Sequence, residues 1–241
     1  MLTVGQRMDG GHASVLGGES MGVAERRRRE RERRRQAILA AAAQLFRERS
    51  YEEVRVQDIA AAAELAKGTV YLYFPDKDAV LAELAAAPLS QLRAQAADAA
   101  AEARSGRLSA VQGIRRVLAA WMDAYEAAPW LFRTLVLDRP RLLREGLSGQ
   151  NGRDGLLAPL EELVAIGRER GELLPGTEPE VLSRALWALF VGGLLLERRG
   201  EVDLADIRRE GMTVLMAQVR GFCVADPGAP GDPGGCPDPE G

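Results

Sequence analysis

The sequence predicts an all-α fold of about nine helices, and three observations support this prediction. Ala, Leu, Glu and Arg dominate the chain between its two ends. Apolar residues there recur at the spacing of a helix, and no stretch shows sustained alternation of β-branched residues. With 241 residues, 46% of them hydrophobic, the chain is long enough to bury a large core.

Each expected helix begins and ends at a recognisable signal. Pro75 and Asp76 separate the third helix from a long fourth one. Pro88 lies inside the fourth helix and is expected to kink or interrupt it, because proline removes a backbone donor. The expected helices cover residues 32–48, 56–63, 65–74, 77–103, 109–127, 129–137, 155–169, 179–198 and 204–224.

The domain organisation follows from composition. Residues 1–22 are rich in Gly and are expected to form a disordered leader, with Met21 as an alternative start. Residues 225–241 repeat Gly, Pro and Asp and are expected to form a disordered tail. Between them we expect a front domain over 23–84 and a larger rear domain over 85–224, joined inside the fourth helix near Leu84.

Several function classes are disfavoured by composition. Two cysteines, Cys223 and Cys236, cannot form a disulfide framework or a cysteine metal cluster, and the one histidine, His12, lies in the expected leader. The sequence has no nucleophile elbow, phosphate loop or metal-ligand spacing, so we expect no enzyme, metal or cofactor. It also has no apolar run of about 18 residues and no secretory signal, so we expect a cytoplasmic protein without a membrane span.

Charge is distributed unevenly along the chain. The net charge is −3, but residues 23–80 carry 13 Lys and Arg against 10 Asp and Glu. A basic front segment on an acidic body suggests a nucleic acid partner. The run from Arg26 to Arg35 holds eight Arg and two Glu. It is either a solvated, salt-bridged helix start or a flexible basic arm that contacts phosphates or the minor groove.

Residues 55–74 predict two short helices joined by a tight turn, an arrangement that can place the second helix in the major groove. Val70 and Phe74 on the second helix can pack on Ile59 and Leu45. The opposite face is expected to point outward, with Gly68 permitting close approach to DNA. The outward-facing residues are Lys67, Gly68, Thr69, Tyr71 and Tyr73.

This stretch, residues 33–84, resembles the N-terminal DNA-binding domain of the TetR family of transcriptional regulators. The resemblance implies a homodimeric repressor that a small apolar or amphipathic ligand releases from its double-stranded DNA operator. The matching residues are Ile38, Leu39, Ala43, Leu45, Phe46, Tyr51, Val56, Asp58, Ile59, Ala60, Ala63, Lys67, Gly68, Thr69, Tyr71, Tyr73, Phe74 and Lys77.

Roles can be assigned to the DNA-binding candidates. Lys67 can reach a guanine edge or a phosphate, and the resemblance implies a phosphate contact for Lys77 at the start of the fourth helix. Thr69 and Tyr71 are expected to contact phosphate or a thymine methyl group. Tyr73 is expected to contact the backbone, and Gln57, in the first turn of the second helix, is a further phosphate candidate.

Three residues depart from the family's usual pattern. Ser50 stands where a Gly usually ends the first helix, and Arg55 stands where Thr usually caps the second, a loss of roughly 0.5–2 kcal/mol. Glu64 stands in the turn where Gly is frequent, and a positive φ there costs about 1 kcal/mol. These departures leave open a helical scaffold of the same fold that has lost DNA binding.

The rear domain offers a ligand pocket and a dimer interface, both implied by the resemblance. The rear aromatic residues either fill a core or line an apolar ligand cavity, with Asp123, Glu126 or Arg133 as its polar contact. The last two helices, with Gly192 and Gly193 permitting close approach, are expected to form the homodimer; the alternative is that their apolar faces are buried within one subunit. The aromatic candidates are Trp121, Tyr125, Trp130, Phe132, Trp187 and Phe190.

Overall fold

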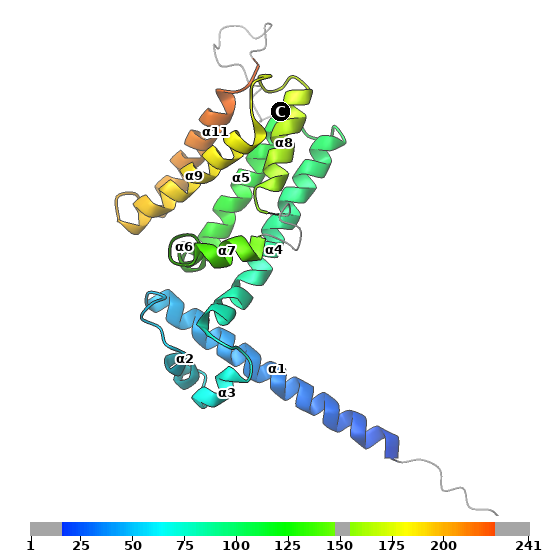
Figure 1. Ribbon diagram of the computed structural model, residues 1–241, viewed down its shortest axis with the longest axis vertical. Coiled ribbons are helices and arrows are strands. Elements are labelled where there is room, and N and C mark those ends of the chain that lie inside the picture. Colours follow the sequence, from blue (N-terminus) through cyan, green and yellow to red (C-terminus); the bar gives the residue numbers. More distant parts are fainter. Residues whose placement is uncertain (1–15, 148–154, 225–241) are drawn as a thin grey trace, which may run out of the picture.

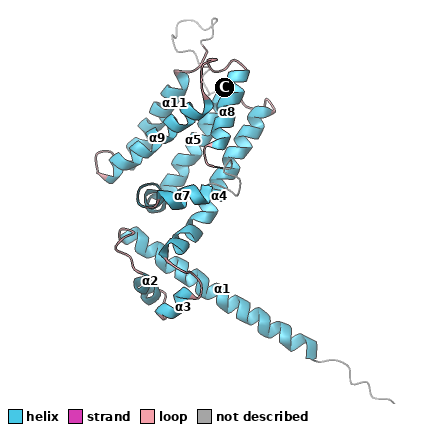
Figure 2. Cartoon of the chain, in the orientation of Figure 1, coloured by secondary structure: helices cyan, strands magenta, loops and turns pink. Residues whose placement is uncertain are grey.

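The structure, a computed structural model, describes residues 16–147 and 155–224, which are helical apart from the connecting loops (Figures 1 and 2). Within this part of the chain, an isolated bridge between Leu173 and Cys223 is the only β-type pairing. The predicted all-α fold is confirmed. The elements are α1 (Leu16–Glu48), α2 (Val56–Ala62), α3 (Lys67–Tyr71), α4 (Lys77–Arg104), α5 (Ala110–Ala127), α6 (Pro129–Arg133), the π-helix η1 (Thr134–Asp138), α7 (Pro140–Leu147), α8 (Ala158–Glu169), α9 (Pro179–Arg198), α10 (Leu204–Asp206), the π-helix η2 (Ile207–Gly211) and α11 (Met212–Arg220).

The helices form two lobes joined by α4 (Figure 1). The front lobe consists of α1, α2, α3 and the first turns of α4, and the rear lobe contains the rest of α4 and the elements from α5 to α11. The Asp76 side chain accepts a 2.7 Å hydrogen bond from the Ala79 amide and so caps α4 at its N-terminus. One continuous helix, α4, therefore takes part in the cores of both lobes.

The first helix is longer than predicted. It begins at Leu16 and not at residue 32, so it includes residues 16–22 of the expected disordered leader. The arginine run is also helical, which contradicts the flexible arm and agrees with the salt-bridged alternative: Arg29 pairs with Glu25 at 3.0 Å and Arg34 with Glu30 at 2.9 Å. Residues 1–15 and the expected tail, 225–241, lie outside the described residues.

Two other predictions about helices need correction. Pro88 does not interrupt α4, which runs from Lys77 to Arg104 with Ala85 and Leu89 buried near the proline. The helix α7 was not predicted; Pro140 begins it, at a position where a missing N–H costs nothing. Counting α6–η1 and α10–η2–α11 as continuous, the described residues form ten helical segments where about nine were expected.

The rear core depends on close contact between α5 and α8. A Cβ built on Gly113 of α5 would lie 2.4 Å from a methyl carbon of Leu163, which is fully buried on α8. Any larger residue at position 113 would therefore require the Leu163 side chain to shift.

One helix of the described residues, α9, is long and apolar enough to cross a membrane by length and composition alone. The search for an apolar run in the sequence did not predict such a helix. In the structure α9 packs against α8 and α11, and 28% of its apolar window is buried. Core helices pass the same test, so this feature is weak evidence for a membrane span, but it does show that α9 has an uncovered apolar surface.

Candidate functional site

The turn between α2 and α3 has the geometry expected of a helix-turn-helix motif. Ile59 and Ala60 on α2 and Val70 on α3 are buried in the hydrophobic core. Glu64 has φ of 55° and is the only non-glycine residue with positive φ among those described. The prediction that a non-glycine residue occupies a strained turn position here is therefore confirmed. The adjacent Leu65 amide closes the turn with a 2.9 Å hydrogen bond to the Ala60 carbonyl.

The other two departures are partly compensated by carboxylates. The Arg55 side chain makes no capping bond, since a guanidinium has no acceptor atom, but Asp58 accepts a 2.8 Å hydrogen bond from the Arg55 amide. At the end of α1, Glu53 accepts hydrogen bonds from both the amide and the hydroxyl of Ser50. These hydrogen bonds stabilise the ends of α1 and α2 in the absence of the usual Gly at position 50 and Thr at position 55.

The predicted contact residues of α3 lie on its outer face. Lys67 and Gly68 are exposed, Tyr71 is 47% exposed and Thr69 is half-buried. The Lys67 ammonium lies 5.9 Å from the centre of the Tyr71 ring. A Cβ added to Gly68 would meet no atom within 4 Å, so the space next to α3 is open there.

The structure places the remaining front-lobe candidates around this face, and adds one. Gln57 is exposed on α2, and Tyr73 is half-buried just after α3. Leu72, which we did not predict as a contact, is 77% exposed beside them. The sequence could have predicted this exposure, because Leu72 lies between two tyrosines and on the side of the helix opposite Val70. An exposed leucine here can make an apolar contact with a thymine methyl group.

Lys77 occupies a different environment from the one expected. Its ammonium donates hydrogen bonds to the carbonyls of Tyr51 at 2.5 Å and Val54 at 2.8 Å, and it lies 4.0 Å from the centre of the Tyr51 ring. Burial lowers the pKa of Lys77. The side chain thus fastens the start of α4 to the loop that precedes α2, and its contact with a phosphate stays a prediction.

A polar cluster connects the two lobes through Arg139, which follows η1. Arg139 pairs with Glu52 at 2.7 Å and with Asp78 at 3.3 Å, and its guanidinium lies 4.4 Å from the centre of the Tyr51 ring. Tyr51 donates a hydrogen bond to Asp78 and is almost fully buried, and both burial and this bond raise the pKa of its phenol. One arginine of the rear lobe therefore contacts three residues of the front lobe.

Trp130 does not lie with the other rear aromatic residues. Its ring is 6.2 Å from that of Phe46 and lies beneath the Arg47 guanidinium, both at the end of α1. The prediction that Trp130 joins the aromatic group is therefore wrong in this structure. Trp130 is the second residue of α6, directly after Pro129, and it lies at the boundary between the lobes.

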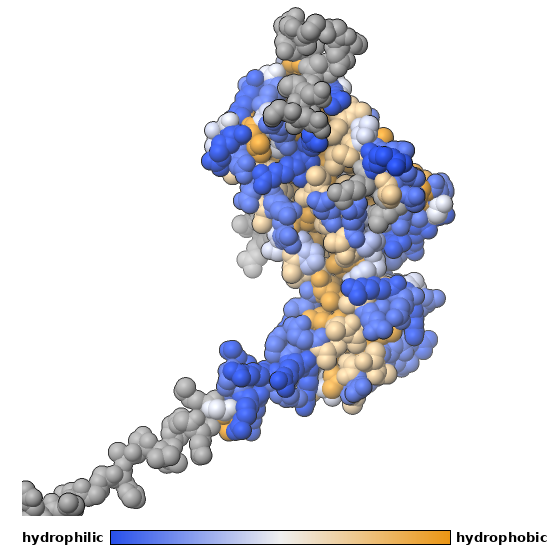
Figure 3. All heavy atoms as spheres, turned by 180° about the vertical axis from the view of Figure 1, so that it is seen from behind, coloured by the Kyte–Doolittle hydropathy of each residue, from blue (hydrophilic) through white to orange (hydrophobic). Residues whose placement is uncertain are grey.

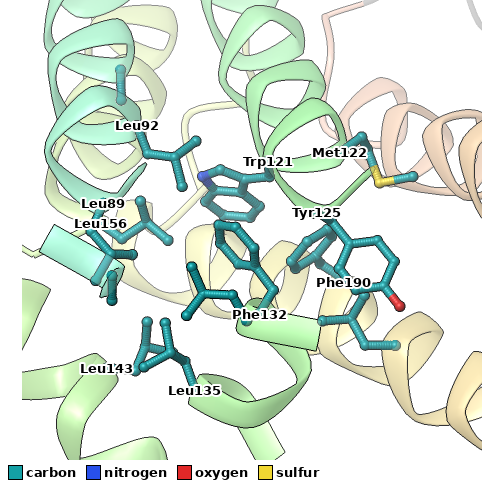
Figure 4. Packing of buried hydrophobic residues seen from close by; sticks show 14 of the residues in the cluster. Leu89, Leu92, Trp121, Met122, Tyr125, Phe132, Leu135, Leu143, Leu156 and Phe190 are labelled. Atoms are coloured by element: carbon teal, nitrogen blue, oxygen red, sulfur yellow. The ribbon is translucent and has the colours of Figure 1, made fainter. Parts of the chain in front are cut away.

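The other aromatic candidates gather in the rear core (Figure 4). Trp121 contacts Trp187 at 5.3 Å and Phe190 at 5.6 Å between ring centres, and Tyr125 lies next to Phe190. Phe132 is buried in the same region (Figure 4). These residues are packed against one another, and their role in binding a ligand stays a prediction.

The aromatic core contains an unpaired donor. The indole N–H of Trp121 is buried and has no hydrogen-bond partner among the described residues, and in Figure 4 its nitrogen points toward Leu92 of α4. The Tyr125 hydroxyl is paired: it donates a 2.8 Å hydrogen bond to Glu197, which also pairs with Arg133 at 3.3 Å. Arg133, one of the three suggested polar residues, is thus linked to the aromatic residues through Glu197.

An open apolar groove of about 570 Å³ runs between α9 and the η2–α11 segment. Leu189, Leu195 and Leu196 are each about 40% exposed in it, and Val214 is 47% exposed on the facing helix. Gly192 and Gly193 form part of its floor. Among the predicted ligand residues only Phe190 reaches the groove, so it is distinct from the aromatic core. Arg199, Asp206 and Glu210 are the charged residues that line it.

No group of His, Cys, Asp and Glu within the described part of the chain could hold a metal ion. Figure 3 shows hydrophilic residues over the outer surface of both lobes and apolar ones at the junction between them.

Comparisons with known proteins agree with this geometry. Residues 38–84 match the family model described as bacterial regulatory proteins, tetR family. Over 48 residues the chain is 44% identical to the HTH-type transcriptional regulator EthR of Mycolicibacterium smegmatis, a match that covers 20% of this chain and 22% of that protein. The chain therefore matches only about a fifth of that relative's length.

Solved structures resemble about three quarters of the chain or more. SmeT, the repressor of the Stenotrophomonas maltophilia multidrug efflux pump SmeDEF, superposes with a TM-score of 0.63 at 24% identity, over 83% of this chain and 96% of SmeT. FadR of Bacillus subtilis, solved with stearoyl-CoA, has a TM-score of 0.61 at 19% identity, over 76% of this chain and 98% of FadR. Residues 38–84 thus match the tetR family model, and the overall fold is that of solved structures such as SmeT and FadR.

Proposed function

We propose that the protein is a homodimeric transcriptional regulator that binds double-stranded DNA in a sequence-specific manner and acts as a repressor released by a small ligand. The observation that carries this proposal is the outer face of α3. It is polar and open, lies opposite the buried Val70, and belongs to the segment that matches the tetR model. Such a regulator acts in the bacterial cytoplasm, where its operator is.

The front domain, residues 23–84, supplies the DNA contacts in this proposal. Lys67 and Thr69 contact base edges or phosphates, and Gly68 lets the helix backbone approach the bases. Lys77 chiefly supports this interface from within, through its bonds to the Tyr51 and Val54 carbonyls. The outer contacts are assigned to Gln57, Tyr71, Leu72 and Tyr73.

The rear domain, residues 85–224, supplies dimerisation and ligand binding. We assign the groove between α9 and α11 to a second copy of the chain, because its apolar side chains are uncovered in the single protomer. Two protomers joined there can present their α3 helices to successive major grooves about 34–36 Å apart. A bound ligand would change the distance between the two α3 helices and so weaken DNA binding.

We assign the ligand to the aromatic core around Trp121, where an unpaired indole donor is available to an acceptor atom. A ligand with a long apolar part and a polar head suits this environment, and FadR, which has the same fold, was solved with stearoyl-CoA. Long-chain acyl-CoA is therefore the first compound to test. Release requires that the ligand bind the DNA-free form more tightly than the DNA-bound form.

The proposed DNA contact is tested by Gly68→Ala. The free protein is expected to be as stable as the wild type or more so, because nothing lies near the added methyl group and Ala favours a helix by about 1 kcal/mol. Affinity for a duplex selected by the wild type from a random-sequence pool is expected to fall about tenfold, or about 1.4 kcal/mol. Gel shifts and thermal unfolding measure the two effects. Gly22→Ala, also with open space around it, is the control, and unchanged affinity of Gly68→Ala would argue against close approach of α3 to the bases.

The ligand assignment is tested by Trp121→Phe. Stearoyl-CoA is expected to release the wild type from the selected duplex, and about tenfold more is expected to be needed for the variant, because the indole donor contributes roughly 1.5 kcal/mol. Fluorescence anisotropy of the labelled duplex gives the release curve. Trp187→Phe keeps the Trp121 donor and is the control; equal curves for the wild type and Trp121→Phe would remove Trp121 from the ligand site.

A further inference from the structure

The first part of α1 projects from the front lobe without a core of its own (Figure 1). No residue from 22 to 37 is buried, and Ile38 is the next one that is. The tetR model also begins its match at residue 38, so this projection lies outside the segment shared with the family. Packing within the protomer therefore does not explain why the helix continues this far.

The projection is strongly basic. Residues 25–35, which we call the basic segment, contain eight Arg and three Glu. Each glutamate is engaged along the same helix, with Glu25 bonded to Arg29, Glu30 to Arg34, and Glu32 to Gln36. The excess of five positive charges remains and is concentrated within eleven residues of one helix. A polyanion would neutralise the repulsion between them.

One face of the basic segment is continuous with the DNA-facing surface of the front lobe. The Arg31 guanidinium lies 5.9 Å from the centre of the Tyr73 ring, and that of Arg35 lies 5.4 Å from the centre of the Phe74 ring. Arg27 and Arg28 precede Arg31 by one turn and share its face. From Arg31, which meets Tyr73, back to Arg27 the helix rises about 6 Å, so this face extends the surface around α3 by that length.

We propose that the basic segment is a second DNA-contacting surface, in which Arg27, Arg28 and Arg31 bind the phosphate backbone beyond the base pairs that α3 contacts. Arginine suits this role because its planar guanidinium binds phosphate oxygens in pairs. A duplex carries about one negative charge for each 1.7 Å of its axis, so several phosphates lie within reach. The segment adds affinity and salt dependence, and it does not select sequence.

Duplex DNA fits this segment better than an anionic membrane. Basic helices that bind membranes carry Trp, Phe or Leu on the face opposite their charges. Residues 25–36 contain only Arg, Glu and Gln. The inference rests on the proposed function, since it takes α3 as the element that contacts bases.

The test compares the full chain with a variant that carries Arg27→Gln, Arg28→Gln and Arg31→Gln. The control carries the same charge change on the rear lobe, through Arg107→Gln, Arg116→Gln and Arg184→Gln. The probe is the duplex that the wild type selects from a random-sequence pool, prepared in a trimmed form and with about 10 additional random base pairs on each side, a number set by roughly one helical turn.

The wild type and the rear-lobe control are expected to bind the long duplex at least tenfold more tightly than the trimmed one, whereas the triple variant is expected to bind both alike. The slope of log affinity against log salt is expected to become shallower by about 2.7 for each protomer, or about 0.9 for each arginine that no longer binds a phosphate. The triple variant is expected to select the same sequence. Amide hydrogens of residues 23–34 are expected to exchange more slowly in the wild-type complex than in the free protein.

Retention of the wild-type flank preference and salt slope by the triple variant would overturn the inference. If the wild type selects no sequence at all, the proposed function fails. The second DNA-contacting surface is then tested with a random duplex of about four helical turns at low salt. Equal binding by the wild type and the triple variant would overturn this surface as well, and weaker binding by the triple variant would support it. Vesicles of phosphatidylglycerol and phosphatidylcholine provide the remaining arm. Loss of vesicle binding in the triple variant with unchanged DNA binding would assign the segment to membranes and overturn the DNA contact.

Discussion

Replacement of Leu189 and Val214 by arginine is expected to convert the protein into a folded monomer that binds its selected duplex about 100-fold to 10,000-fold more weakly. Both residues line the groove between α9 and α11, and they are 41% and 47% exposed. Charges on the two facing helices would have to be buried by any second copy that docks there. Each monomer would then engage only one half-site.

Sedimentation velocity gives the mass of this double variant, and gel shifts give its affinity. Leu174→Arg is the control, because Leu174 is 42% exposed but lies outside the groove. A dimeric double variant, or a wild type that is monomeric at every concentration and still binds DNA tightly, would contradict the proposed dimer.

Replacement of Lys77 by methionine is expected to lower the free energy of unfolding by about 1–3 kcal/mol, because two carbonyl groups in the loop before α2 lose their donor. Affinity for DNA is expected to fall with the stability of this loop, while the salt slope stays that of the wild type. Urea unfolding and gel shifts over a range of salt concentrations measure the two quantities.

Lys67→Met is the matched control, since Lys67 and Lys77 are the only lysines of the chain. Lys67 is exposed on α3, so its replacement is expected to leave stability unchanged and make the salt slope shallower by about 0.9 for each protomer. The same change of slope in Lys77→Met would assign Lys77 to a phosphate, and unchanged stability of that variant would contradict its structural role.

The front lobe could be predicted closely from the sequence because its signals are local. The short helices, the strained turn at Glu64 and the missing side-chain cap at Arg55 all depend on residues a few positions apart. The interior of this lobe was also predictable, since Val70 and Phe74 alternate with polar residues at helical spacing. What the sequence could not predict was the environment of Lys77, which depends on backbone carbonyls more than 20 positions away.

The rear lobe was predicted less well because its pattern is apolar on more than one face. The bounds of α9 were correct, but which of its faces is uncovered depends on how α8 and α11 pack. Trp130 shows the same difficulty: as an aromatic residue it suits a core, and only the fold carries it to Phe46 at the lobe boundary. Contacts such as those of Arg139 with Glu52 and Asp78 leave no local signal.

The uncovered apolar surface of α9 has a consequence for how the gene circuit would respond to protein abundance. Under the proposed function, DNA occupancy depends on the square of the protomer concentration wherever that concentration is below the dimer dissociation constant. Small changes in synthesis or dilution at cell division would then produce larger changes in transcription. The hydrophobicity of one helix face would thus set the threshold and steepness of the regulatory response.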